Sequence, residues 1–330
     1  MTAPDAHQAA AGDALPLLAV EGLTLERGPS RILDGVSLTL GRGETLALVG
    51  ESGAGKSTIA FALMGLIGKG EAKIAGRMRF DEVEDLVSLN ERGWGRLRGR
   101  RIAMVFQDAG AALDPCYTVG GQLVSVLRRQ LGLSRAKARE RALELLEGVG
   151  INDAEARLSA YPHELSGGMQ QRVMVAIALA CNPELLLADE PTSALDVTIQ
   201  AQIIRLILTE IRARGASCVF VLHDLALASQ SCDKIVVLYA GQVMEAGPSR
   251  GILEHPRHPY TRLLKSCVLE IGTETLDPPE GGVPSYGDMP AGCRFATRCP
   301  NALPRCFAER PVLAAEGERL IACFNPEPRQ

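Results

Sequence analysis

Residues 50–58 read Gly50-Glu51-Ser52-Gly53-Ala54-Gly55-Lys56-Ser57-Thr58 and decide the fold, because they fit the pattern G-x-x-x-x-G-K-[ST] without a gap. The apolar run 45–49 before them predicts a buried strand, and residues 59–67 after them have helical spacing without a proline. A strand, a glycine loop and a helix, in this order, are the context that a phosphate-binding loop requires. The alternative is a glycine-rich turn that matches by chance, and the flanking elements argue against it.

The residue types of this stretch suit phosphate chemistry. Glycines let the loop curl so that backbone N–H groups point inward at phosphate oxygens. The helix that begins near Lys56 directs its positive end at the same anion. Lys56 supplies a mobile charge for the outer phosphates, and Ser57 offers a hydroxyl to Mg²⁺. We therefore expect all nine residues to bind a nucleotide.

The composition is that of an ordinary soluble protein. The chain has 330 residues, 46% hydrophobic and 22% charged, which predicts one large domain with an appendage, or two domains. A net charge of −4 and only 4% aromatic residues argue against a nucleic-acid partner. No run approaches the about 18 apolar residues of a membrane span, and the N-terminus lacks the basic start of a secretion signal. We expect a cytoplasmic protein with a disordered tail over 1–15.

Apolar runs and helical segments alternate along the chain. This order predicts an α/β fold with a mostly parallel sheet. A helical insert is expected over 119–149, with Ser134 as a helix cap. We place the main domain at 16–250, with a helical part over about 108–182, and a small cysteine-bearing extension at 251–330. The buried strands are expected at 45–49, 102–106, 184–188, 218–222 and 235–239.

Polar side chains follow three of these strands. Ligands of parallel α/β proteins bind at the carboxyl ends of strands. Asp189 is thus placed to hold Mg²⁺, and Glu190 to act as general base toward the attacking water. His223 is expected beside the γ-phosphate, and Gln107 is expected to coordinate Mg²⁺ and sense the water. A helix cap is the alternative for the two acids, and a structural role is the alternative for His223.

The stretch Leu165-Ser166-Gly167-Gly168-Met169-Gln170 predicts a second anion site, because a serine and two glycines open a helix. One chain then carries two phosphate-binding helix starts but only one lysine loop. One explanation is that each serves a different copy of the nucleotide pocket.

These motifs together resemble those of an ATP-binding cassette (ABC) ATPase. They occur in the order of that family and cover about residues 17–247. The resemblance implies a RecA-like core with a mixed sheet and a helical subdomain. The matching motifs are Walker A at 50–58, the Q-loop at Gln107, the signature at 165–170, Walker B at 185–190, the D-loop Ser193-Ala194-Leu195-Asp196 and the switch histidine His223.

The resemblance also implies that ATP lies between the Walker A face of one cassette and the signature of another. The residues expected to contact the partner's ATP are Ser166, Gly167 and Gly168, and Met169 and Asp196 are also expected to bind nucleotide. Arg27 stands near the position where the family has an aromatic residue that stacks on adenine. Stacking on the Arg27 guanidinium, on Leu25, or on nothing from this stretch stays open, and we expect weaker base selectivity.

Further stretches resemble the oligopeptide/dipeptide (and nickel) importer branch. They are Tyr161-Pro162-His163-Glu164, residues 196–202, His258-Pro259-Tyr260-Thr261 and residues 290–300. The branch implies an ATPase subunit that powers peptide import from the cytoplasmic face of the membrane. Its partners would be a second, non-identical ATPase chain, two membrane permease subunits and an extracytoplasmic substrate-binding protein. A nickel or other small-solute importer, a soluble ABC ATPase and a non-hydrolytic scaffold subunit are the alternatives.

Four cysteines near the C-terminus have the spacing Cys293-x₅-Cys299-x₆-Cys306-x₁₆-Cys323. Four thiolates suit either tetrahedral zinc or an iron–sulfur cluster. Zinc sites usually show tighter C-x₂₋₄-C pairs, which are absent here, so a [4Fe–4S] cluster is favoured. Zinc and free thiols stay open. His255 and His258 are expected to be loop residues, since prolines flank both.

Overall fold

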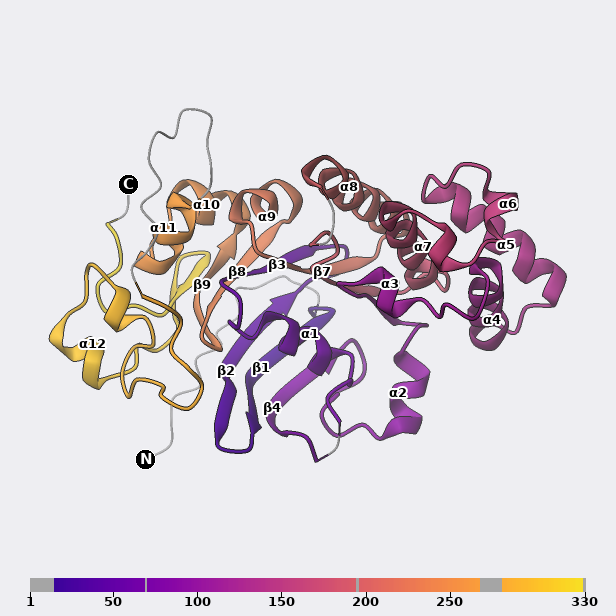
Figure 1. Cartoon of the computed structure of the whole chain (residues 1–330). Helices are drawn as coiled ribbons and strands as arrows, with labels where there is room; N and C mark the ends of the chain where they lie inside the picture. The colour runs from indigo at the N-terminus through magenta and orange to yellow at the C-terminus, as the bar shows by residue number, and fades with distance from the viewer. Residues whose placement is uncertain (1–14, 69, 194–195, 268–280, 329–330) are drawn as a thin grey trace.

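The computed structural model describes residues 15–68, 70–193, 196–267 and 281–328, in which two sheets and a lobe of helices are arranged side by side (Figure 1). The smaller sheet is antiparallel, with the order β2-β1-β4. Each of its strands pairs with a neighbour along most of its length. They are β1 (Leu18–Arg27), β2 (Ser30–Leu40) and β4 (Lys73–Phe80).

The larger sheet has the order β10-β11-β9-β8-β3-β7-β6-β5. Neighbours from β8 through β5 pair in parallel, whereas β9 pairs antiparallel with β8. The α/β fold with a mixed sheet is therefore confirmed. The strands are β3 (Thr45–Val49), β5 (Ile102–Val105), β6 (Leu185–Asp189), β7 (Ser217–Leu222), β8 (Lys234–Tyr239) and β9 (Gln242–Pro248).

Helices α4 to α7 form a lobe at one end of the molecule, opposite the C-terminal extension (Figure 1). The predicted helical insert and its Ser134 cap are confirmed, since Ser134 Oγ accepts from Lys137 N at 3.4 Å. The helices are α1 (Lys56–Leu63), α2 (Glu91–Leu97), α3 (Ala109–Ala112), α4 (Val119–Leu131), α5 (Arg135–Gly148), α6 (Ala154–Arg157), α7 (Gly167–Leu179), α8 (Val197–Arg214), α9 (Leu225–Ser231), α10 (Ser249–Glu254), α11 (Pro259–Ser266) and α12 (Pro304–Ala308), with 3₁₀ turns at Pro162–Glu164 and Ala296–Arg298.

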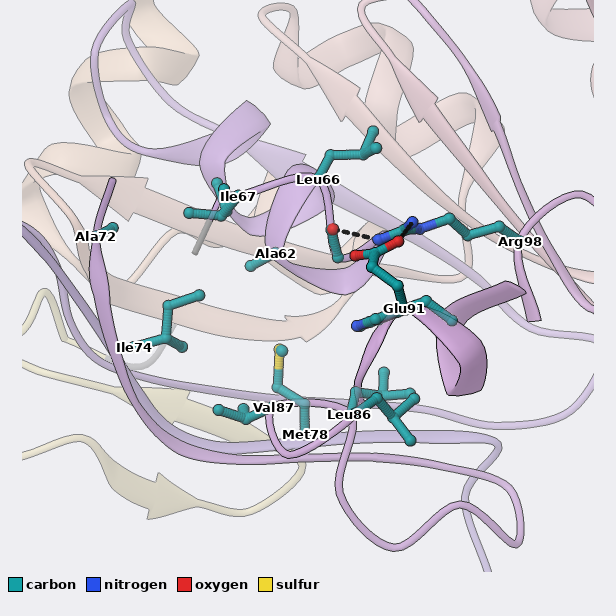
Figure 2. A pocket seen from close by; sticks show the side chains of 14 residues that line it. Ala62, Leu66, Ile67, Ala72, Ile74, Met78, Leu86, Val87, Glu91 and Arg98 are labelled. Atoms are coloured by element: carbon teal, nitrogen blue, oxygen red, sulfur yellow. Dashed lines mark hydrogen bonds and ion pairs between the residues drawn. The ribbon is translucent and has the colours of Figure 1, made fainter. Parts of the chain in front are cut away.

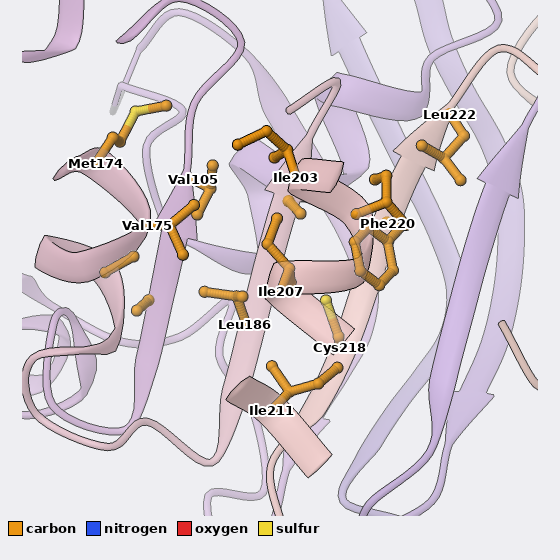
Figure 3. Close-up of a cluster of buried hydrophobic side chains, with 14 of the residues drawn as sticks. Val105, Met174, Val175, Leu186, Ile203, Ile207, Ile211, Cys218, Phe220 and Leu222 are labelled. Atoms are coloured by element: carbon orange, nitrogen blue, oxygen red, sulfur yellow. The ribbon is translucent and has the colours of Figure 1, made fainter. Parts of the chain in front are cut away.

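Helix α8 fixes the position of the central strands. Its residues Ile203, Ile207 and Ile211 recur at a spacing of four and are buried against side chains of β6 and β7, among them Leu186 and Phe220 (Figure 3). Burying such side chains stabilises the fold by about 1.5–3 kcal/mol each. The carboxyl ends of β6 and β7, which carry the predicted catalytic residues, therefore rest on a rigid support.

The C-terminal extension joins the larger sheet. Its strands β10 (Ala314–Glu316) and β11 (Arg319–Ile321) pair with each other, and β11 pairs antiparallel with β9. Arg294 is 1% exposed and reaches Asp34 on β2 at 2.7 Å. The domain boundary at 250 and 251 stays a prediction, and residues 1–14 of the predicted tail 1–15 lie outside the described residues. Across the described ranges no helix has the length and apolar character to span a bilayer.

Candidate active site

The phosphate loop joins β3 to α1 and curls tightly. Gly53 and Gly55 have φ of 78° and 95°, a left-handed conformation that glycine adopts without steric cost. Ala54 N donates to Glu51 O at 3.1 Å and closes the curl. An open pocket lies against the loop, lined by residues 52–58 together with Gln107, Glu190, His223 and Tyr286. The structure thus brings the loop together with three of the residues predicted from strand ends.

Lys56 is held inside the curl. Its Nζ donates to Gly50 O at 2.8 Å and Glu51 O at 3.0 Å, and lies 3.4 Å from His223 Nδ1. Burial lowers the pKa of Lys56, and the carboxylates of Glu190, Asp189 and Glu51 oppose that shift. A partly desolvated ammonium of this kind interacts strongly with an anion, which suits contact with phosphate.

Asp189 ends β6 beneath the loop and is 3% exposed. Ser57 Oγ donates to Asp189 Oδ1 at 2.7 Å. Burial raises the pKa of Asp189, and the hydrogen bond from Ser57 works against that rise. A serine hydroxyl beside a carboxylate at the start of the loop helix is a donor set that fits Mg²⁺, which prefers oxygen ligands.

The carboxylate of Glu190 contacts side chains that follow two neighbouring strands. Gln107 Nε2 donates to its Oε2 at 3.0 Å, and His223 Nε2 lies 2.5 Å from its Oε1. The three side chains follow β5, β6 and β7, which are neighbours in the sheet. Glu190 also has φ of 43°, a strained backbone conformation of the kind that clusters at functional sites. The carboxylate is therefore held at a defined place facing the pocket.

The other predicted nucleotide contacts do not line this pocket in the described part of the chain. Ser166 is exposed at the start of α7, where its Oγ accepts from Met169 N at 3.4 Å. Asp196 caps α8, where its Oδ1 accepts from Ile199 N at 3.0 Å. Arg27 lies at the end of β1. The roles of these residues, and of Gly167 and Gly168, stay predictions, and Ala194 and Leu195 of the predicted D-loop lie outside the described residues.

Sequence reasoning missed three contacts to the loop that come from the C-terminal extension. Tyr286 lines the pocket, and its hydroxyl donates to Gly53 O. Tyr260 and Arg298 contact Glu51. Tyr260 and Arg298 lie in stretches that resemble the importer branch, so a signal was present for them. Tyr286 lies in a region rich in proline and glycine that carries no such signal.

The four C-terminal cysteines line one pocket, together with the buried side chains of His258 and Phe295. Backbone N–H groups point at their sulfurs, as in Leu303 N to Cys306 Sγ and Asn325 N to Cys323 Sγ, both at 3.4 Å. Burial raises the pKa of Cys293 and of Cys299, and it raises that of Cys323 to about 11. Within the described ranges, no three or more His, Cys, Asp or Glu side chains are grouped so as to hold a metal ion.

A third pocket lies at the far end of α1, between β4 and α2 (Figure 2). Its lining is mostly apolar, from Leu66, Ile67 and Met78 among others. Arg98 closes one side by donating to Gly65 O and by pairing with Glu91 at 2.9 Å. The predicted site residues do not line this third pocket.

The geometry agrees with comparisons to known proteins. A family model described as ABC transporter matches residues 33–193, and one described as the C-terminal region of oligopeptide/dipeptide transporters matches residues 244–306. The dipeptide transport ATP-binding protein DppD of Escherichia coli strain K12 is 45% identical over 320 residues, which is 94% of this chain and 97% of that protein. This chain belongs to the family of ABC transporter ATP-binding proteins.

Other members of the ABC family support the same assignment. The oligopeptide transport ATP-binding protein AppD of Bacillus subtilis strain 168 is 42% identical over 303 residues, covering 91% of this chain and 92% of that protein. The ATP-binding cassette MJ0796, solved as a dimer in a post-hydrolysis state with ADP and Pi, superposes with a TM-score of 0.63 at 29% identity, over 71% of this chain and 99% of that one. The present chain is therefore an ATPase that uses ATP and Mg²⁺.

Proposed function

We propose that this ABC ATPase powers the import of dipeptides or oligopeptides. The observation that carries the proposal is the match to the E. coli dipeptide transport protein along nearly the whole of both chains, C-terminal region included. The chain would act as a peripheral subunit on the cytoplasmic face of the membrane. Its partners would be a second ATPase chain, two membrane permease subunits and an extracytoplasmic substrate-binding protein.

The arrangement of side chains suggests a division of roles in hydrolysis. The loop N–H groups and Lys56 would hold the phosphates, and Ser57, Asp189 and Gln107 would supply the oxygens that hold Mg²⁺. That ion would neutralise charge developing on the phosphate oxygens. Glu190 would accept a proton from the water that attacks the γ-phosphorus, and His223, in contact with both Lys56 and Glu190, would orient that carboxylate.

The exposed helix start at Ser166 fits a site that a second chain completes. Its N–H groups and the helix dipole favour an anion, yet the chain's own phosphate loop lies elsewhere. We infer that residues 166–169 and Asp196 serve the ATP bound to the partner's loop. The partner's equivalent segment would then complete this chain's pocket.

Transport by the reconstituted complex tests the proposed substrate. The assembled complex in proteoliposomes should accumulate a labelled dipeptide when ATP is supplied on the side of this chain, and the dipeptide with its binding protein should stimulate ATP hydrolysis. A free amino acid of the same composition is the matched control and should do neither. Uptake of nickel without uptake of any peptide would overturn the proposal.

We further propose that the four cysteines hold a [4Fe–4S] cluster. The supporting observation is that all four line one pocket, with backbone N–H groups directed at their sulfurs. The cysteine spacing lacks the tight C-x₂₋₄-C pairs of most zinc sites, which favours a cluster over zinc. A cluster would supply a redox-active centre whose potential such hydrogen bonds tune.

Metal analysis of protein purified without oxygen tests the cluster. We expect a brown protein with about four iron and four sulfide per chain, and Cys323→Ser should lose most of both. Cys116→Ser is the matched control, because Cys116 is exposed and lies outside the cysteine pocket. Stoichiometric zinc, or a colourless protein without iron, would contradict the assignment.

A further inference from the structure

The C-terminal extension contacts the phosphate loop at three points. Arg298 forms a two-pronged ion pair with Glu51, with Nη1 to Oε2 at 2.8 Å and Nη2 to Oε1 at 3.0 Å. Tyr260 Oη accepts from Glu51 N at 2.9 Å, and Tyr286 Oη donates to Gly53 O. Both the backbone and the side chain of Glu51 are thus held by residues that lie more than 200 positions away in the sequence.

The ion pair is shielded from water. The Arg298 side chain is 5% exposed, and that of Glu51 is 26% exposed. The guanidinium also donates to Tyr239 Oη at 3.2 Å and lies 5.7 Å from the Tyr239 ring centroid and 5.9 Å from that of Phe295. Planar, paired donation combined with packing against aromatic rings is a geometry that lysine does not reproduce. The pair is therefore specific, unlike an exposed surface ion pair.

Glu51 in turn holds the residue that reaches the phosphates. Its carbonyl accepts from Lys56 Nζ at 3.0 Å and from Ala54 N at 3.1 Å. Displacing Glu51 would therefore shift both the curl of the loop and the position of the ammonium.

The charge of Glu51 adds a second effect. Its carboxylate belongs to a loop that binds anionic phosphates, and like charges at short range repel. Arg298 neutralises this carboxylate. Without Arg298, an unpaired negative charge would stand beside the nucleotide.

We propose that Arg298 is a positioning residue of the ATP site, acting through Glu51, and that the C-terminal extension is a working part of that site. The inference rests on the proposed role of the loop in binding ATP. The turn Ala296–Arg298 connects Cys293 to Cys299, so the cysteine pocket and the contact with the phosphate loop share one short backbone segment. A change at the cysteine pocket would consequently be transmitted to the ATP site.

Calorimetric titration of the full chain with ATP and Mg²⁺ tests the proposal. For Arg298→Ala we expect the dissociation constant to rise about tenfold, which corresponds to about 1.4 kcal/mol. Adding Glu51→Gln to this variant should recover most of the loss, because it removes the unpaired charge. Raising the salt concentration should also shrink the defect of Arg298→Ala, since salt screens the repulsion. If Arg298 only stabilised the fold, neither the added Glu51→Gln change nor a higher salt concentration would restore ATP affinity.

Arg310→Ala is the matched control. Arg310 belongs to the same extension, but its ion pair is with Asp34 at 2.6 Å, and the variant should bind ATP like the wild type. Arg298→Lys keeps the positive charge but cannot donate two parallel hydrogen bonds to Glu51, so its dissociation constant for ATP should rise less than that of Arg298→Ala. This variant tests the inference if Arg298→Ala does not fold. Equal affinity of Arg298→Ala and Arg310→Ala, or a double variant no better than Arg298→Ala, would overturn the inference. A wild-type chain that does not bind ATP would instead contradict the proposed function itself.

Discussion

Glu190→Gln should reduce ATP hydrolysis by about 10²–10⁴-fold, the contribution typical of a general base, and leave ATP affinity nearly unchanged. The amide keeps the size of the carboxylate and one oxygen that can accept from Gln107 or His223, but it cannot take a proton from water. Phosphate release from the assembled complex measures turnover, with the partner's site silenced so that only this chain's pocket is observed. Calorimetry measures affinity.

A carboxylate far from the pocket gives the control for that variant. Glu155 on α6 is exposed and pairs with Arg139, so Glu155→Gln should hydrolyse ATP like the wild type. Hydrolysis at the normal rate by Glu190→Gln would show that another group accepts the proton.

Lys56→Met should weaken ATP binding about 100-fold. Methionine fills a similar volume but removes the ammonium, and two charge-assisted hydrogen bonds to phosphate are together worth about 3 kcal/mol or more. The loop would also lose the bonds from Lys56 to the carbonyls of Gly50 and Glu51, which hold its curl. Calorimetric titration measures the affinity, and circular dichroism checks that the variant is folded.

An exposed lysine provides the comparison. Lys137 lies on the surface of α5, and Lys137→Met should bind ATP with wild-type affinity. If Lys56→Met did the same, the loop N–H groups alone would account for phosphate binding.

The sequence could predict the positions of Gln107, Glu190 and His223 but not the contacts among their side chains. Each follows an apolar run, which predicts a strand end near the nucleotide. That His223 and Gln107 both contact the same carboxylate depends on β5, β6 and β7 being adjacent in the sheet, although residues 107 and 190 are 83 positions apart. The order of strands in a sheet depends on how the helical connections between strands pack against the sheet. It is therefore a long-range property that no local sequence pattern encodes.

The C-terminal extension shows the same limit more sharply. Its four cysteines indicated a common site by their number and spacing, and the structure places them around one pocket. Its strands β10 and β11, however, extend the large sheet beyond β9, and the contact between Arg298 and Glu51 joins residues 247 positions apart. Arg298 is a single residue beside a cysteine and belongs to no repeating pattern, so the sequence could not identify Glu51 as its partner.

The sequence by itself determined the phosphate loop, the order of strands and helices along the chain, and all the residues that line the pocket beside the loop except Tyr286. These follow from local rules, since glycine conformation, apolar periodicity and helix starts depend on neighbouring residues. Only the tertiary structure decided that residues after two neighbouring strands contact Glu190 and that Ser166 lies away from the chain's own pocket. It also decided that Arg298 of the C-terminal extension contacts the phosphate loop. These depend on the packing of distant segments, where burial strengthens an ion pair only after the chain has folded around it.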